Sequence, residues 1–162
     1  MSDPSYRWKG NTYSLELKCN DLQEVLAFAM PGVYIESGTD FRMSIEKTGD
    51  LKASLNSQRI AFKKNYMKDL SIAFDNLNES LSGNITCNEI AVANFLTRDN
   101  ILQLHANENM FGAGFSFYNR TEPEAKGEII LNGKVSREYD NPVFDFKIRP
   151  SSIQYDSKEW NI

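Results

Sequence analysis

Residues 41–55, FRMSIEKTGDLKASL, decide the fold class of this chain. Apolar side chains take every second position on both sides of Thr48-Gly49-Asp50, and polar or charged side chains take the positions between them. Strict alternation places successive side chains on opposite faces of a β-strand, whereas a helix needs a period of 3.6 residues. Glycine supplies a positive φ and aspartate bonds its own backbone, so the central triplet is typical of a turn. The stretch therefore predicts a β-hairpin with one apolar side.

The same alternation runs through most of the chain and predicts about eleven short strands. Asparagine, aspartate or proline interrupts it at 76–80, 121–123 and 140–142, which we interpret as turns. Short strands spaced by turns are typical of an all-β, mainly antiparallel domain. The apolar positions outside 41–55 are Leu15, Leu17, Ile60, Phe62, Leu70, Ile72, Phe74, Leu81, Ile85, Cys87, Leu102, Leu104, Ala106, Ala113, Phe115, Phe117, Ile129, Leu131, Val135, Phe144, Phe146, Ile148, Ile153 and Tyr155.

One segment, residues 21–30, has a helical period instead. Its apolar positions follow the i, i+3, i+4, i+7 spacing of an amphipathic helix, so we expect one buried face. Asn20 or Asp21 is a suitable N-cap, and Pro31-Gly32 ends the helix. A second apolar run at 90–95 is too short to predict as a helix. The apolar positions of the first segment are Leu22, Val25, Leu26 and Ala29.

Composition narrows the class of protein. The 162 residues carry 18 Lys and Arg against 22 Asp and Glu, a net charge of −4, and their length fits one domain spanning 1–162. Mild acidity without a basic cluster argues against nucleic acid as a partner. No apolar run approaches the roughly 18 residues of a membrane span. Cys19 and Cys87 are too few for a disulfide scaffold; two buried free thiols are favoured over one disulfide, and the sequence does not decide between them.

The predicted strands pose a physical problem, because each has one apolar side and one polar side. An antiparallel sheet of such strands exposes a broad apolar face, and a single helix of about ten residues, about 15 Å long, is too short to cover it. Two arrangements bury that face. A closed β-sandwich or barrel has a packed core, whereas a curved or U-shaped sheet leaves an apolar hollow that takes a hydrophobic guest. Periodicity alone leaves both open.

Residues suited to catalysis are scarce. His105 is the only histidine, so catalytic triads, Cys-His pairs and multi-histidine metal sites lack their parts, and its place in the alternation puts it on the polar side. The carboxylates are scattered and no pair is brought together. Gly112-Ala113-Gly114 leads into an aromatic strand rather than a helix, which excludes a dinucleotide fingerprint. We therefore expect no enzyme activity, no metal and no cofactor.

Four stretches in order along the chain resemble the TamB branch of the AsmA-like envelope proteins. Residues 13–22 resemble the strand and short helix of that family, and residues 31–41, PGVYIESGTDF, resemble its recurrent P-x-x-x-I-x-x-G-T-x-hydrophobic motif. Residues 107–119 with 127–129 resemble its run of a short strand, an asparagine turn, an aromatic strand and a G-x-hydrophobic strand. Residues 150–162 resemble its closing pair of strands. No single motif is specific, and their order carries the resemblance.

The resemblance implies a β-taco, a U-shaped sheet with an apolar inner face. It implies that the chain is an excised segment of a longer, repeat-like β protein, anchored in the inner membrane by an N-terminal helix and lying in the periplasm. The implied function is phospholipid transfer between the inner and outer membranes, outer-membrane protein assembly, or both. The implied partners are phospholipid acyl chains and, through other parts of the full chain, a barrel protein of outer-membrane assembly.

An apolar groove of this kind has candidate lining residues on the apolar sides of the strands. In a closed sandwich the same residues are core, and the function is then that of a binding module for glycan or protein, with Tyr6, Trp8 or Tyr139 at exposed loop tips. The candidates for the lipid groove are Phe41, Met43, Ile45, Leu70, Ile72, Phe74, Leu102, Leu104, Phe115, Phe117, Leu131, Phe144 and Phe146.

Overall fold

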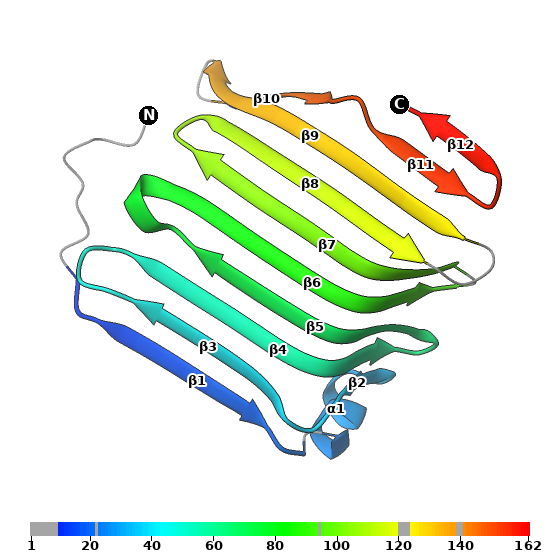
Figure 1. Cartoon of the computed structure of the whole chain (residues 1–162). Coiled ribbons are helices and arrows are strands. Elements are labelled where there is room, and N and C mark those ends of the chain that lie inside the picture. Colours follow the sequence, from blue (N-terminus) through cyan, green and yellow to red (C-terminus); the bar gives the residue numbers. More distant parts are fainter. Residues whose placement is uncertain (1–9, 22, 94, 120–123, 139–140) are drawn as a thin grey trace.

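The computed structural model describes residues 10–162 apart from 22, 94, 120–123 and 139–140. The described part forms one open, curved antiparallel sheet of twelve strands with one short α-helix (Figure 1). The prediction of an all-β chain with an open sheet is thereby confirmed, and the alternative of a closed sandwich or barrel is wrong. The elements are β1 Tyr13–Cys19, α1 Gln23–Ala29, β2 Val33–Ile35, β3 Thr39–Ile45, β4 Leu51–Phe62, β5 Asn65–Asp75, η1 (a 3-10 turn) Leu77–Glu79, β6 Ser80–Val92, β7 Phe95–Asn107, β8 Met110–Asn119, β9 Ala125–Glu138, β10 Asn141–Ile148, β11 Ser152–Tyr155 and β12 Lys158–Asn161.

Strand order follows chain order almost throughout. The sheet runs β1-β3-β4-β5-β6-β7-β8-β9-β11-β12, and most neighbours are successive hairpins. Two long strands, β4 and β9, each pair on one side with two short strands that follow one another along the long strand. β3 pairs with 51–56 of β4 while β2 pairs with 60–62 of it, and β10 pairs with 131–138 of β9 while β11 pairs with 125–128.

The register gathers the apolar side chains on one face of the sheet. Phe41 lies opposite Leu55, and Leu55 lies opposite Ile72. The intervening positions form a polar face, on which the Ser71 hydroxyl donates a hydrogen bond of 2.9 Å to the side-chain oxygen of Asn56. We call the first side the apolar face. Its row through Phe41 continues across β6 to β9 as Ile85, Leu102, Phe115 and Ile129.

The longest strands bend sharply near one end, and the bend crosses the sheet as a single row of residues. Ser57 lies opposite Leu70, Leu70 opposite Cys87, and Cys87 opposite Asn100. Thr39 of β3 joins the row because its hydroxyl lies 2.6 Å from that of Ser57. Side chains on the inner side of a bend are covered by both arms of the sheet. The row accordingly holds buried side chains, 3% to 7% exposed: Thr39, Ser57, Leu70, Cys87, Asn100 and, on β8, Phe117.

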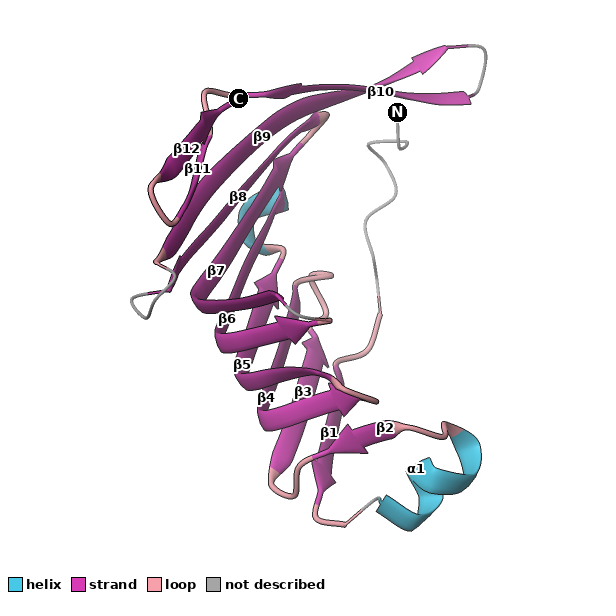
Figure 2. Cartoon of the chain, turned by 90° about the vertical axis from the view of Figure 1, so that its right-hand side faces the viewer, coloured by secondary structure: helices cyan, strands magenta, loops and turns pink. Residues whose placement is uncertain are grey.

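The outer side of the bend is polar and exposed. The strand pairing skips four residues here, namely Gln58, Asp69, Asn88 and Asp99. The side-chain amide of Asn88 donates a hydrogen bond of 3.2 Å to the Asp69 carboxylate. Asp69 and Asp99 have left-handed backbones, with φ of 51° and 47°. Aspartate tolerates this region better than most residues. These two residues turn β5 and β7, and the sheet therefore curves toward its apolar face. Figure 2 shows the sheet curved along its length as well, with the β2 and β10 ends reaching to the same side.

The sheet has almost no core of its own. The described hydrophobic residues that are buried are Ala61, Leu70, Cys87, Phe117 and Ala125. The chain exposes 12083 Å², whereas a compact protein of 18.5 kDa exposes about 8,200 Å². A single curved layer explains the difference, because each strand packs against its neighbours in the sheet and no second layer of the described residues packs on either face.

Several local predictions need correction. The strands predicted at 51–55 and 60–62 are one strand, β4, and residues 90–92 end β6. Asn141 and Pro142 begin β10 instead of forming a turn, and 121–123 lies outside the described residues. The helix forms at Gln23–Ala29 within the predicted segment, but none of its described residues is buried. Its expected buried face is wrong, since α1 packs chiefly against the three-residue strand β2.

Candidate functional site

The strand register places all thirteen predicted groove residues on the apolar face. Met43, Ala53 and Phe74 are successive cross-strand partners, and the same row reaches Leu104, Leu131 and Ile148 through Gly83 and Ala113. Phe144 and Phe146 join from β10, opposite Val135 and Gly133 of β9. Leu70 and Phe117 lie in the buried row of the bend. The remaining predicted residues on this face are Phe41, Ile45, Ile72, Leu102 and Phe115.

Three phenylalanine rings of the apolar face lie over glycines of the neighbouring strand. Phe74 faces Gly83, Phe117 faces Gly127, and Phe111 faces Gly133. In each pair the ring occupies the space that a Cβ on the glycine would need. A ring that lies across the next strand covers the backbone and stays close to the sheet. In these pairs the phenyl rings therefore lie flat against the sheet and do not project into the space on its concave side.

Nothing in the described part of the chain covers the apolar face. At the β1 end of the sheet Tyr13, Leu15 and Leu17 are exposed, and Phe144 and Phe146 are exposed at the β10 end. The central residues are half-buried by their neighbours in the sheet alone. A large apolar surface left in water is unfavourable and marks a place where something binds.

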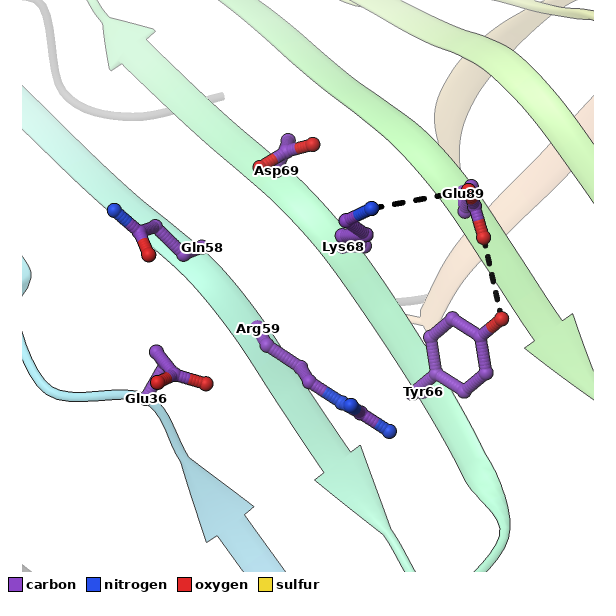
Figure 3. A pocket seen from close by; sticks show the side chains of 7 residues that line it. All are labelled: Glu36, Gln58, Arg59, Tyr66, Lys68, Asp69 and Glu89. Carbon is purple, nitrogen blue, oxygen red and sulfur yellow. Dashed lines mark hydrogen bonds and ion pairs between the residues drawn. The ribbon is translucent and has the colours of Figure 1, made fainter.

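The apolar face continues beyond the bend through residues that were not among the predicted groove residues. Gln58 and Arg59 follow each other on β4, as Lys68 and Asp69 do on β5, yet all four line one pocket on the outer side (Figure 3). The alternation of faces therefore shifts by one residue at the bend. On the short arm this shift turns the apolar row Ile35, Ile60, Met67 and Ile90 to the concave side. The sequence carries one sign of this shift, because apolar positions on the two sides of the bend are three residues apart, as from Met67 to Leu70, and not two or four.

The pocket on the outer side of the bend has a volume of about 430 Å³ and a charged lining. Within this lining, Tyr66 and Lys68 both contact Glu89. The Tyr66 hydroxyl donates a hydrogen bond of 3.2 Å to Glu89, and the Lys68 ammonium lies 4.0 Å from the same carboxylate. The Arg59 guanidinium stacks 4.9 Å from the centre of the Tyr66 ring (Figure 3). Beside the pocket, the Tyr34 hydroxyl donates to Glu36 over 3.0 Å, and this hydrogen bond raises the pKa of Tyr34.

A second hollow, of about 540 Å³, is lined mainly by residues of the polar face of β1, β3, β4 and β5. Small side chains such as Ser54 and Ala73 form much of its lining, and Glu16 and Arg42 lie among them. The Lys18 ammonium and the Arg42 guanidinium, each 3.2 Å from Glu16, lower the pKa of that carboxyl. The first hollow thus lies outside the predicted groove, whereas the lining of the second includes Met43 and Phe74 of the predicted groove.

The described residues hold no arrangement typical of catalysis or metal binding. His105 is exposed on the polar face, with its Nδ1 atom 3.5 Å from the Ser80 hydroxyl. No cluster of three or more His, Cys, Asp or Glu residues suited to a metal occurs in this part of the chain. Cys19 and Cys87 are free thiols, and the Cys87 thiol donates to the carbonyl oxygens of Lys68 and Glu89. Tyr6, Trp8 and Tyr139, proposed for a glycan-binding module, lie outside the described residues.

Among the helices that the structure describes, none has the length and apolar character needed to span a membrane. Comparison of the chain with protein-family models, with curated proteins and with solved structures gave no match. Nothing in these comparisons identifies a TamB-like or AsmA-like protein, so that resemblance stays a prediction from the sequence.

Proposed function

We propose that this chain is a non-catalytic lipid-carrying segment whose concave apolar face binds the acyl chains of phospholipids. The observation that carries the proposal is the apolar face itself, which crosses the sheet from β1 to β10 and is covered by no described part of the chain. Acyl chains gain about 0.8 kcal/mol for each methylene group that leaves water, so a bound lipid supplies the apolar contacts that a second protein layer would otherwise make.

The chemistry of the face favours transport over tight recognition. The row from Phe41 to Ile129 and the row from Met43 to Ile148 contain aliphatic, aromatic and small residues and no charged side chain. Hydrophobic contact is non-directional, so an acyl chain that moves along such a surface exchanges one contact for an equivalent one. A surface of this kind needs no catalytic residue in order to move lipid.

The resemblance to the TamB branch supplies the cellular setting of the proposal. In that setting the chain is part of a longer, inner-membrane-anchored protein of the periplasm and carries phospholipid between the two membranes. Support of outer-membrane protein assembly, through a barrel partner bound by other parts of the full chain, belongs to the same setting. The sandwich-based alternative, a glycan- or protein-binding module, has lost its structural basis because the sheet is open.

Native mass spectrometry of the protein purified from cells tests the proposal, since bound phospholipid is expected at a mass above that of the chain. Leu102→Asp introduces a charge in the middle of the apolar face and should abolish lipid retention. Gln103→Asp, one residue further along β7 and exposed on the polar face, is the matched control and should retain lipid. Leu102→Ser replaces the first variant if its circular dichroism shows a lost fold. A lipid-free wild-type protein, or equal retention by Leu102→Asp and Gln103→Asp, overturns the proposal.

A further inference from the structure

The helix α1 exposes the apolar side that a helix on a protein surface normally buries. Phe28 is 92% exposed and Val25 is 63% exposed, and their spacing of three residues puts them on one side of the helix. Met30, directly after the helix, is exposed as well. This helix therefore presents apolar side chains to its surroundings.

Two hairpin tips extend this exposed apolar surface. The tip between β4 and β5 is adjacent to α1, because the Lys63 amide donates to the Gly32 carbonyl over 2.8 Å and Phe62 pairs with Val33. The tip between β6 and β7 is adjacent in turn, because the Ala93 amide donates to the side-chain oxygen of Asn65 over 2.9 Å. We call α1 and these two tips the rim; they lie together at one end of the sheet (Figures 1 and 2). The half-exposed apolar residues of the tips are Phe62, Val92 and Phe95.

The rim is continuous with the concave side of the sheet. Phe62 and Val92 stand two residues beyond Ile60 and Ile90 on the same strands, so they share the face of that apolar row. A molecule that enters the apolar face from this end of the sheet meets the rim first.

The charges of the tips fit a phospholipid headgroup layer. Lys63 and Lys64 form the turn beside Phe62, and the Lys63 ammonium lies 5.2 Å from the centre of that ring. Neither tip carries a carboxylate; the nearest one along the rim is Glu24 of α1. Aromatic and aliphatic side chains next to a pair of lysines are the chemistry of an interfacial anchor, in which the rings enter the acyl boundary and the ammonium groups stay with the phosphates.

We propose that the rim docks on the surface of a phospholipid bilayer and so places the open end of the apolar face against the membrane. This inference rests on the proposed function, because it identifies the end of the apolar face at which lipid enters. The occupant is a bilayer surface, and not a soluble protein or a second copy of the chain, because the tip pairs apolar side chains with cationic ones and bears no acidic counterpart for self-association.

Co-sedimentation with vesicles tests the inference, and two compositions serve as probes: phosphatidylcholine alone, and phosphatidylcholine with phosphatidylglycerol. The wild-type chain should bind the anionic vesicles more tightly. Lys63→Gln with Lys64→Gln should weaken that binding about thirty-fold, and Phe28→Ser with Phe95→Ser should weaken binding to both compositions about ten-fold or more. Lys47→Gln, in the turn at the other end of β4, and Trp160→Ser, at the far edge of the sheet, are matched controls and should bind as the wild type does.

The outcomes separate this inference from the proposed function. Vesicle binding by a chain that retains no individual lipid supports the rim and overturns the lipid-carrying proposal, whereas lipid retention without vesicle binding does the reverse. Rim variants that bind vesicles like the wild type overturn the inference. A light-scattering mass that shows a dimer in the wild type and a monomer in Phe28→Ser with Phe95→Ser also overturns it, because the rim is then an interface between copies.

Discussion

Phe117 of β8 and Gly127 of β9 are direct cross-strand partners, and the phenyl ring of Phe117 lies where a Cβ of residue 127 would stand. Both residues are buried at the inner side of the bend. The pair explains why a glycine occupies the interior of a strand, where it is ordinarily unfavourable. The same relationship recurs between Phe74 and Gly83, so the apolar face is built on rings that cover glycines.

Replacement of Gly127 by alanine should therefore destabilise the protein. The added methyl group displaces the Phe117 ring from a buried site, and such overpacking costs about 1–3 kcal/mol of the free energy of unfolding. Urea denaturation followed by circular dichroism measures the change. Gly114→Ala is the matched control, because a Cβ there has no neighbour within 4 Å, and it should change stability by less than about 1 kcal/mol. Equal losses in the two variants would contradict this account of Gly127.

A charge introduced on the apolar face should destabilise the protein much more at the bend than at the edge of the sheet. Phe117→Asp buries an unpaired carboxylate in the inner row and should cost more than about 3 kcal/mol of unfolding free energy. Phe146→Asp, on the same face but exposed on β10, should cost less than about 1 kcal/mol. Thermal unfolding of both variants measures the difference. If the protein tolerates the charge at position 117, or loses much of its stability from the charge at position 146, the two positions are not buried and exposed in solution as described.

The alternation along the chain was sufficient to predict the fold class and the face of all thirteen predicted groove residues. Period-two patterning fixes which side chains share a face once the hairpins form, and that is why Phe41, Leu102 and Leu131 lie on one side as expected. It did not predict the length of the strands. Between β7 and β8, as between β4 and β5, a two-residue turn lacks a glycine and uses a left-handed Glu108 or Lys63, which gives a weak turn signal.

The bend and the second arm of the apolar face do not follow from strict period-two alternation. Asp69 and Asp99 interrupt β5 and β7 with single left-handed residues, and an isolated aspartate in a strand pattern has no distinctive signature. Ile60 was predicted on a separate short strand at 60–62, and its partner Met67 was not predicted on the apolar side. The exposure of α1 could not be predicted either. The spacing of its apolar residues predicts a helix with an apolar side, but it does not show whether another part of the fold covers that side.

The bend itself should be sensitive to the residue at position 99. A β-branched side chain is strained at a φ of 47°, so Asp99→Val should lower the free energy of unfolding by about 1–2 kcal/mol. Because 1 kcal/mol shifts the melting temperature of a chain of this size by about 2–4 °C, calorimetry resolves the effect. Asp99→Gly removes the strain and should melt within about 3 °C of the wild type.

Gln103→Val is the control for valine at an exposed position of the same strand with ordinary backbone, and it should be neutral. A destabilisation by Gln103→Val as large as that by Asp99→Val would assign the loss to valine on β7 in general and not to the left-handed backbone.

The thiol of Cys87 should be chemically protected and should make stability fall at alkaline pH. Its burial in the inner row raises its pKa, so the folded state disfavours the reactive thiolate. Iodoacetamide should accordingly label Cys19, which is only half-buried, before Cys87, with mass spectrometry of the peptides as the measurement. The unfolded thiol ionises first as pH rises; the stability it contributes is therefore present below the ordinary thiol pKa and is lost toward the raised value. Cys87→Ala should lack this part of the alkaline loss, and a pH profile parallel to that of the wild type would contradict the buried, protonated thiol.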